Sequence, residues 1–496
     1  MIAWGRRIVA GALCVALAGC AATPDYHPPT LSVPARWSEA PESSVSAASA
    51  DSPWWTTFNA PELDSLVKRA LRANLDLRLA EARVREARAR RGATAASQWP
   101  LVDARASGAR ERDSRNAPNP VLVRPDGQVE SPGQQENFFQ AGFDATWEFD
   151  LFGGTRRSIE AAQADVESAV YDRDAVLLTL LAEVSRNYIE LRGAQAQRRI
   201  ARESLAAQQD MLTLVRARYV AGMATDLDVA RAEAQVQQTT SQLPALDASY
   251  KKALHRLDVL LGQPPGAFAD ELRSARPIPV PSVQPPLGVP SDLLRQRPDI
   301  RSAERRLAAA SARLGVAKAD LYPKFSLLGT LGLASVAPGD FFNSASTLWS
   351  VGPSMTWPIF QGGRIVSTIK VRDAQQQQAL IACRRAILNG IEDVENAVAG
   401  YRHERAQRTA LAKAVDSEQR AVYFARGRYT SGLTDFRDVL DAQRSLFQAQ
   451  SELAQRDTAV SLDLVALYKA LGGGWSAVVL ANKQPARSPG GEGEAK

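Results

Sequence analysis

Residues 139–151, with the sequence FQAGFDATWEFDL, alternate between apolar and polar side chains. The odd positions carry phenylalanine, alanine, tryptophan and leucine, whereas the even positions carry glutamine, glycine, threonine and acidic residues. Because successive side chains of a strand point to opposite faces, this pattern predicts a β-strand with one apolar and one polar face. Residues 349–359, WSVGPSMTWPI, alternate in the same way. The chain therefore contains at least two strands whose faces meet different surroundings.

A weaker strand precedes each of these stretches, which gives two hairpins. We expect strands at about 98–112 and 138–151 in the first hairpin, and at about 322–335 and 348–360 in the second. The chain thus contributes four strands.

The two hairpins belong to two copies of one repeat. Arg218, Tyr219, Gly222 and Asp228 recur 210 positions later as Arg428, Tyr429, Gly432 and Asp438. An earlier block that begins at Asp76 recurs 223 positions later at Asp299. The two offsets differ because the first copy has a longer loop near residues 116–136. Such self-similarity indicates a tandem duplication.

The duplication predicts the domain boundaries. We expect a first repeat at 61–263, a Pro-rich linker at 264–290, a second repeat at 291–472 and a C-terminal tail at 473–496. In each repeat the hydrophobic period changes from helix to strand, strand and helix.

Very long helices are predicted after each hairpin. Proline-free sequence rich in Ala, Arg, Gln, Leu and Glu runs from Thr155 to about Tyr219, and Arg364 to Tyr429 matches it. At 1.5 Å per residue, about 65 residues make a helix of roughly 100 Å, which exceeds the needs of a single globular core. Each helix turns at Gly222 or Gly432 and returns through about 35 residues, as the following helical pattern indicates.

The first residues have the features of a processing signal. Arg6 and Arg7 precede an apolar stretch at 8–18 that is too short to span a bilayer. The stretch ends in Leu-Ala-Gly-Cys, which resembles the bacterial lipobox, so we expect residues 1–19 to be removed and Cys20 to carry N-acyl and S-diacylglycerol lipid. Residues 20–60 would form a lipidated N-terminal segment. The alternative is an ordinary signal peptide with a chance cysteine.

Composition argues against several classes of protein. The formal net charge is +6, and Arg is spread along the chain beside Asp and Glu, unlike the concentrated basic face of a nucleic-acid binder. The three histidines are far apart, which disfavours a zinc site. No serine or cysteine lies in a familiar nucleophile motif, so a periplasmic hydrolase is disfavoured and we expect no catalytic residue, cofactor or metal. A periplasmic adaptor, another user of long helical hairpins, would lack the paired amphipathic strands.

The amphipathic strands predict an oligomeric barrel in a membrane. Four strands alone would leave edge N–H and C=O groups unpaired in hydrocarbon. Two chains would give eight strands, about the number whose interior side chains fill, whereas three chains would give twelve and leave a lumen. A homotrimer is therefore favoured. The odd positions would face lipid, namely Phe139, Phe143, Trp147, Trp349, Val351 and Trp357.

Several motifs resemble those of the outer-membrane factor family, the TolC and OprM type. They are Pro290 to Leu294, Arg297 to Leu307, Trp54-Trp55 with Phe58, Asp438 to Gln443, and Leu467 to Trp475. The match covers about residues 50–475, and with the lipobox it is most similar to the OprM-like lipoprotein branch.

The resemblance implies a mixed α and β membrane protein. Its fold would be a tandem-duplicated helix-strand-strand-helix repeat in a homotrimer, with a 12-stranded β-barrel continuous with a 12-helix α-barrel. It further implies a non-enzymatic exit duct in the outer membrane of a Gram-negative bacterium. The duct would work with a periplasmic adaptor and an inner-membrane RND-type transporter, and pass drugs or other small molecules. The alternative cargo is secreted protein or polysaccharide.

The resemblance also implies a periplasmic gate at the second helical turn. Asp438 and Asp441 match the family's constriction aspartates, and Tyr429 lies just before the turn. Arg437 departs from the apolar residue of OprM-type sequences, and it would either pair with an aspartate across the entrance or point outward. The alternative role for Asp435 and Asp438 is to favour a helix N-terminus.

Overall fold

The computed structural model describes residues 33–39, 53–112, 114, 135–281, 287, 290–291 and 296–475. The expected signal segment, Cys20 and the tail beyond residue 475 lie outside these ranges, as do parts of the N-terminal segment and of the linker. The described residues divide into two compact units. One unit carries the sheet and lies within 85–167 and 305–381, and the other is helical and lies within 33–84, 168–304 and 382–475.

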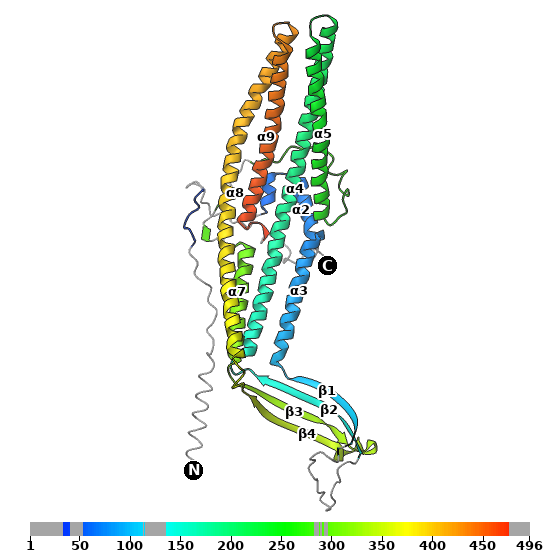
Figure 1. Cartoon of the computed structure of the whole chain (residues 1–496), viewed down its shortest axis with the longest axis vertical. Coiled ribbons are helices and arrows are strands. Elements are labelled where there is room, and N and C mark those ends of the chain that lie inside the picture. Colours follow the sequence, from blue (N-terminus) through cyan, green and yellow to red (C-terminus); the bar gives the residue numbers. More distant parts are fainter. Residues whose placement is uncertain are drawn as a thin grey trace, which may run out of the picture. The chain divides into compact units, whose positions relative to one another are not determined.

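The four strands form one antiparallel sheet in the order β1-β2-β3-β4 (Figure 1). The strands are β1 (Leu101–Arg112), β2 (Gln135–Phe149), β3 (Lys324–Ser335) and β4 (Thr347–Thr356). Although β2 and β3 come from different repeats, they pair along eleven positions, from Phe139 opposite Ser335 to Phe149 opposite Phe325. The duplicated hairpins thus make one continuous sheet.

The register places like side chains in the same rows. Ala104, Phe143, Leu331 and Trp349 lie opposite one another across the four strands. The next row contains Asp103, Asp144, Thr330 and Ser350. Since residues in one row share a face, the apolar and polar faces expected from separate stretches of sequence coincide across the sheet.

The strand ends differ from the expected ones. A short 3-10 helix occupies Ala96–Gln98, so β1 begins at Leu101 rather than near residue 98. The last strand ends at Thr356, although we expected it to reach residue 360, and Trp357 therefore lies just beyond the strand. Pro358 follows and has no N–H to donate, which prevents it from continuing the ladder as a donor.

Each repeat has the same pair of long helices after its hairpin. The first repeat has α4 (Gly154–Val220) and α5 (Asp226–Leu260), and the second has α8 (Arg364–Thr430) and α9 (Phe436–Ala470). Both outgoing helices have 67 residues and both returning helices have 35. Shorter helices precede the hairpins, namely η3 (Trp54–Phe58), α2 (Pro61–Ala73), α3 (Leu75–Ala95) and α7 (Pro298–Ala319). None of the described helices is long and apolar enough to cross a membrane.

The two helical turns use left-handed glycines but differ in their caps. Gly222 and Gly432 have φ of 71° and 73°, which side chains with a Cβ adopt only at a cost. In the first turn, Thr225 and Asp228 form a capping box at the start of α5. In the second turn, Asp435 is the N-cap of α9 and makes no side-chain capping hydrogen bond. The two turns therefore have similar backbones but different N-terminal caps.

The helical unit has its core around Trp54. This indole is 1% exposed, stacks on Tyr468 at 5.2 Å between ring centroids, and donates from Nε1 to the Gly473 carbonyl at 3.2 Å. The short η3 helix near the start of the described chain is thereby fixed to the end of α9. Leucines of α2, α4, α5 and α9 complete the cluster.

Equivalent residues of the two repeats cap the returning helices with different chemistry. Asn74 Nδ2 donates to the Leu260 carbonyl at the end of α5, at 3.0 Å. At the matching position, Arg297 Nη1 donates to the Ala470 carbonyl at the end of α9, at 3.2 Å. Arg297 also pairs through Nη2 with Asp299 and Asp393, at 2.8 and 2.9 Å, while its side chain is only 10% exposed. The Arg297-Pro298-Asp299 sequence motif is therefore an anchor for the C-terminal end of α9.

We expect Arg297→Met to lower the free energy of unfolding by about 2 to 4 kcal/mol, because it removes the guanidinium and leaves its carbonyl and carboxylate partners without a donor. Asn74→Ala should cost less, about 1 to 3 kcal/mol, since one neutral hydrogen-bonding group is lost. Thermal unfolding of the purified protein measures both. Arg385→Met changes an exposed arginine on α8 and is the control; an equal loss in all three variants would contradict the anchor.

Candidate functional site

One face of the sheet is a broad apolar surface. In the single chain Phe143 is 57% exposed, Trp349 72% and Val351 65%. A monomeric protein in water rarely exposes a contiguous apolar surface of large side chains. Phe139 lies on the same face at the far end of β2, opposite Gly108 and Ser335. This surface has the composition of a lipid-facing strand surface.

The opposite face carries charged and hydroxyl side chains. Thr330 donates from Oγ1 to Asp144 Oδ1 at 3.0 Å, and Arg105 Nε lies 3.4 Å from Asp144 Oδ2. Closer to the helices, Glu148 lies opposite Ser326 of β3. Charged and hydroxyl side chains keep their hydration best when they face water. The polar face is therefore suited to line an aqueous lumen.

Aromatic side chains mark the end of the sheet where the strands join the helices. Trp147 Nε1 donates to the Gln98 carbonyl at 2.9 Å, and Trp357 Nε1 donates to the Leu321 carbonyl at 3.1 Å. The two indoles occupy equivalent places in the two repeats. Tryptophan is favoured at such a boundary because its ring is apolar while its N–H needs a partner. We call these two residues the aromatic girdle, because membrane barrels carry aromatic side chains in such a position at their interfaces.

The second helical turn is tied to the first repeat. Tyr429 is 4% exposed and its ring lies 5.9 Å from that of Phe436. Arg218, at the end of α4, places its guanidinium 4.7 Å from the centre of the Tyr429 ring. Arg218 Nη1 also donates to the Tyr429 carbonyl at 2.8 Å. A cation–π contact and a hydrogen bond therefore hold the two helical tips of one chain together.

The other expected gate residues are exposed on the first turns of α9. Arg437 Nε lies 3.6 Å from Asp441 Oδ2, one turn further along the same helix. The Asp438 carboxylate accepts a hydrogen bond from the Thr434 hydroxyl. Tyr429, in contrast, is buried, and burial raises the pKa of its phenol, which the nearby Arg218 partly offsets. The structure thus places the two aspartates on the surface of the tip and Tyr429 beneath it.

Sequence reasoning missed the role of Arg218 and Phe436. Arg218 recurs as Arg428, so the repeat itself singled it out, but a helical arginine is ordinarily a solvated residue. Only the tertiary packing of the two tips shows that it reaches the tyrosine. Among the described residues, no group of three or more His, Cys, Asp or Glu could hold a metal ion.

Similarities to known proteins bear on this arrangement. The family model described as "Outer membrane efflux protein" matches residues 66–263 and 289–473. The chain belongs to this family. It is 34% identical over 466 residues to the pyoverdine export outer membrane protein OpmQ of Pseudomonas aeruginosa, covering 93% of this chain and 95% of that protein. It is 30% identical over 471 residues to the cation efflux system protein CusC of Escherichia coli K12, covering 93% and 98%.

A solved structure has the same fold. The outer-membrane channel OprN is 35% identical, with a TM-score of 0.85, and the match covers 92% of this chain and 99% of that one. These similarities confirm the resemblance inferred from the sequence, and the expected long helices with four antiparallel strands per chain. The protein is an outer-membrane efflux channel and not an enzyme.

Neighbouring residues of β4 offer a direct test of the two faces. Val351→Arg should impair membrane assembly by roughly 2 to 4 kcal/mol, because it would place a charge in the bilayer near its midplane. Ser350→Arg, on the opposite face, should assemble and instead reduce cation permeation. Heat-modifiable migration of outer-membrane fractions measures assembly, and reversal potentials in planar bilayers measure selectivity. Normal assembly of Val351→Arg beside failure of Ser350→Arg would reverse the assignment.

Proposed function

We propose that three copies of the chain close one barrel and conduct efflux cargo through its lumen. The observation that carries the proposal is the sheet itself. Its outer strands β1 and β4 each have one edge without a partner strand among the described residues. In hydrocarbon, such an edge must be paired. Three sheets joined β4 to β1 keep every neighbour antiparallel and give twelve strands, enough to leave a lumen.

Cysteine crosslinking tests this closure. The test protein has Cys383 replaced by Ser and carries two introduced cysteines, one at Ala104 of β1 and one at Val351 of β4. A short flexible crosslinker that spans the register should link the β1 cysteine of one chain to the β4 cysteine of the next. Non-reducing gels should show dimers and trimers. A matched protein with both cysteines on the central strands β2 and β3 should link only within the chain. A ladder that ends at dimer would contradict the trimer.

The channel we propose is one part of a larger pump. Relatives are named for pyoverdine export and for cation efflux, which supports transport out of the cell through an outer-membrane component. We infer that the helical tips meet a periplasmic adaptor, and that an inner-membrane RND-type transporter supplies the energy. Because the relatives are named for different cargoes, we infer that the channel passes drugs or other small molecules and that the transporter selects which of them enter.

We further infer that the second helical turn closes the periplasmic entrance. Asp438 and Asp441 are exposed at the tip, so three chains would present three copies of each around the axis. Arg437 shields one of them, because it is paired with Asp441 in the same helix. Tyr429 supports the turn from within.

Replacing both Asp438 and Asp441 by Ala should weaken cation selectivity in planar bilayers and reduce block by multivalent cations added from the periplasmic side. Arg437→Ala should do the opposite, because it exposes the Asp441 charge. If the double variant assembles as a trimer and its selectivity and block are unaltered, these two residues do not form the gate. The proposal of an efflux channel would be unaffected by that result.

Cys20 is proposed as the lipid anchor, on the strength of the preceding Leu-Ala-Gly residues. A clickable fatty acid fed to cells should label the wild type but not Cys20→Ser. Equal labelling of both proteins would refute the anchor. We also propose repeat boundaries at 61–263 and 291–472, from the internal duplication, and lipid-facing odd positions of the strands, from their alternation.

A further inference from the structure

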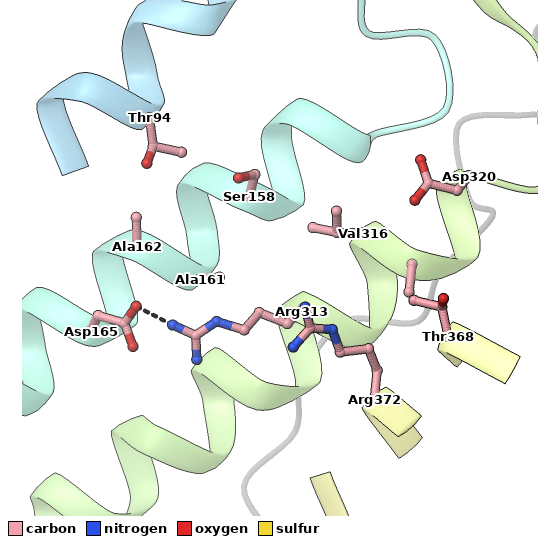
Figure 2. Close-up of a pocket in the computed structure, with 11 residues that line it drawn as sticks. Thr94, Ser158, Ala161, Ala162, Asp165, Arg313, Val316, Asp320, Thr368 and Arg372 are labelled. Carbon is pink, nitrogen blue, oxygen red and sulfur yellow. Dashed lines mark hydrogen bonds and ion pairs between the residues drawn. The ribbon is translucent and has the colours of Figure 1, made fainter. Parts of the chain in front are cut away.

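A cavity of about 330 Å³ opens among four helices of the unit that carries the sheet (Figure 2). Thr94 of α3, Ser158 and Asp165 of α4, Arg313 of α7 and Arg372 of α8 line it. The lining also includes small side chains, among them Ala161 and Ala317. Because alanines leave space between the helices, the longer polar side chains of the lining can reach into it.

The charges that line the cavity do not balance. Arg313 forms an ion pair with Asp165, shown as the dashed line in Figure 2. Asp320, the other acidic residue of the lining, pairs with Lys324 at 3.3 Å. Arg372 pairs with no carboxylate among the described residues, and its Nη1 donates to the neutral amide oxygen of Gln375 at 2.9 Å. The lining therefore has one guanidinium charge that nothing in the cavity compensates.

Hydrogen-bond donors remain free around this charge. The hydroxyls of Thr94 and Thr368 already donate to carbonyls of their own helices, those of Arg90 and Arg364. The Ser158 hydroxyl makes no hydrogen bond within the described part of the chain, so it can donate into the cavity. A guanidinium has five N–H donors, of which the contacts above use only some. The site thus offers two arginines and a serine hydroxyl to a ligand that accepts hydrogen bonds.

The cavity lies close in sequence to the aromatic girdle. Asp320 stands four residues before β3 begins, and its neighbour Leu321 accepts the Trp357 indole N–H. In the proposed channel this level is the periplasmic surface of the membrane, within reach of lipid headgroups. Basic pockets between helices at the cytoplasmic surface of other membrane proteins bind such headgroups. Only this placement rests on the proposed function.

We propose that the cavity is a binding site for a phosphate group, held by Arg372 and Arg313 with the Ser158 hydroxyl. Guanidinium and phosphate have opposite charges, and the paired N–H donors of a guanidinium have the spacing of two phosphate oxygens. The phosphate could belong to the headgroup of an anionic phospholipid or to a dissolved phosphate ion. A lipid source would make the cavity a seat for one membrane lipid, and a soluble source would make it an anion site.

Two measurements on delipidated full-length protein in dodecyl maltoside distinguish these sources. Native mass spectrometry detects retained phosphatidylglycerol, and calorimetric titration detects inorganic phosphate. Arg372→Gln should lower the affinity for the ligand that binds by about tenfold, which corresponds to the loss of one charge-assisted hydrogen bond. Arg385→Gln, an exposed change on the same helix, is the matched control, and light scattering verifies that both variants keep the wild-type assembly.

Binding of phosphatidylglycerol that Arg372→Gln alone weakens supports a lipid seat. Binding of inorganic phosphate with the same dependence supports a soluble anion site. Binding of neither probe, or an equal loss in the two variants, overturns the proposal. Neither measurement requires conduction, so the outcome is independent of the proposed channel.

Discussion

The need of every buried backbone N–H and C=O group for a partner governs this molecule. Its four strands pair with one another inside the sheet, but the outer edges of β1 and β4 have no partner strand in the part of the chain that the structure describes. In the proposed barrel, the apolar row through Phe143 would lie against hydrocarbon and the polar row through Asp144 would enclose water. The hydrogen-bonding requirement at the strand edges is what would join the chains of that barrel.

Duplication supplies the symmetry, and substitutions within the copies break it. The returning helices have equal length, but different side chains bind their C-terminal carbonyls. Asn74 binds the end of α5, whereas a buried arginine with two carboxylate partners, Arg297, binds the end of α9. The helical turns share a left-handed glycine, yet only the first has a capping box. In each case the backbone geometry is retained while the side chain is changed. Two copies of one architecture can therefore take different mechanical roles without a change of fold.

Much of this could be read from the sequence because it is periodic. Alternation in residues 139–151 gave the faces of the sheet, and proline-free sequence between glycines gave both long helices to within a few residues. The end of β4 was harder, since Trp357 continues the alternation although the ladder has already stopped at Thr356. The Arg218–Tyr429 contact and the cavity beside Arg372 could not be foreseen. Both depend on how helices far apart in sequence pack, and an arginine on a long polar helix carries no local sign of its partner.

The contact between Arg218 and Tyr429 has an implication for how a ring of these tips would move. Its counterpart in the repeat would join Arg428 to Tyr219, but within the described chain Tyr219 interacts with Asp226 of its own turn and Arg428 makes no such contact. In a ring of three chains the six tips would therefore meet at two kinds of seam in alternation, one inside a chain with the Arg218–Tyr429 contact and one between chains, where Arg428 would face Tyr219 of the neighbouring chain. Because the Arg218–Tyr429 contact joins the two tips of each chain, these tips would move as one unit. An aperture formed by three such units would dilate with threefold rather than sixfold symmetry.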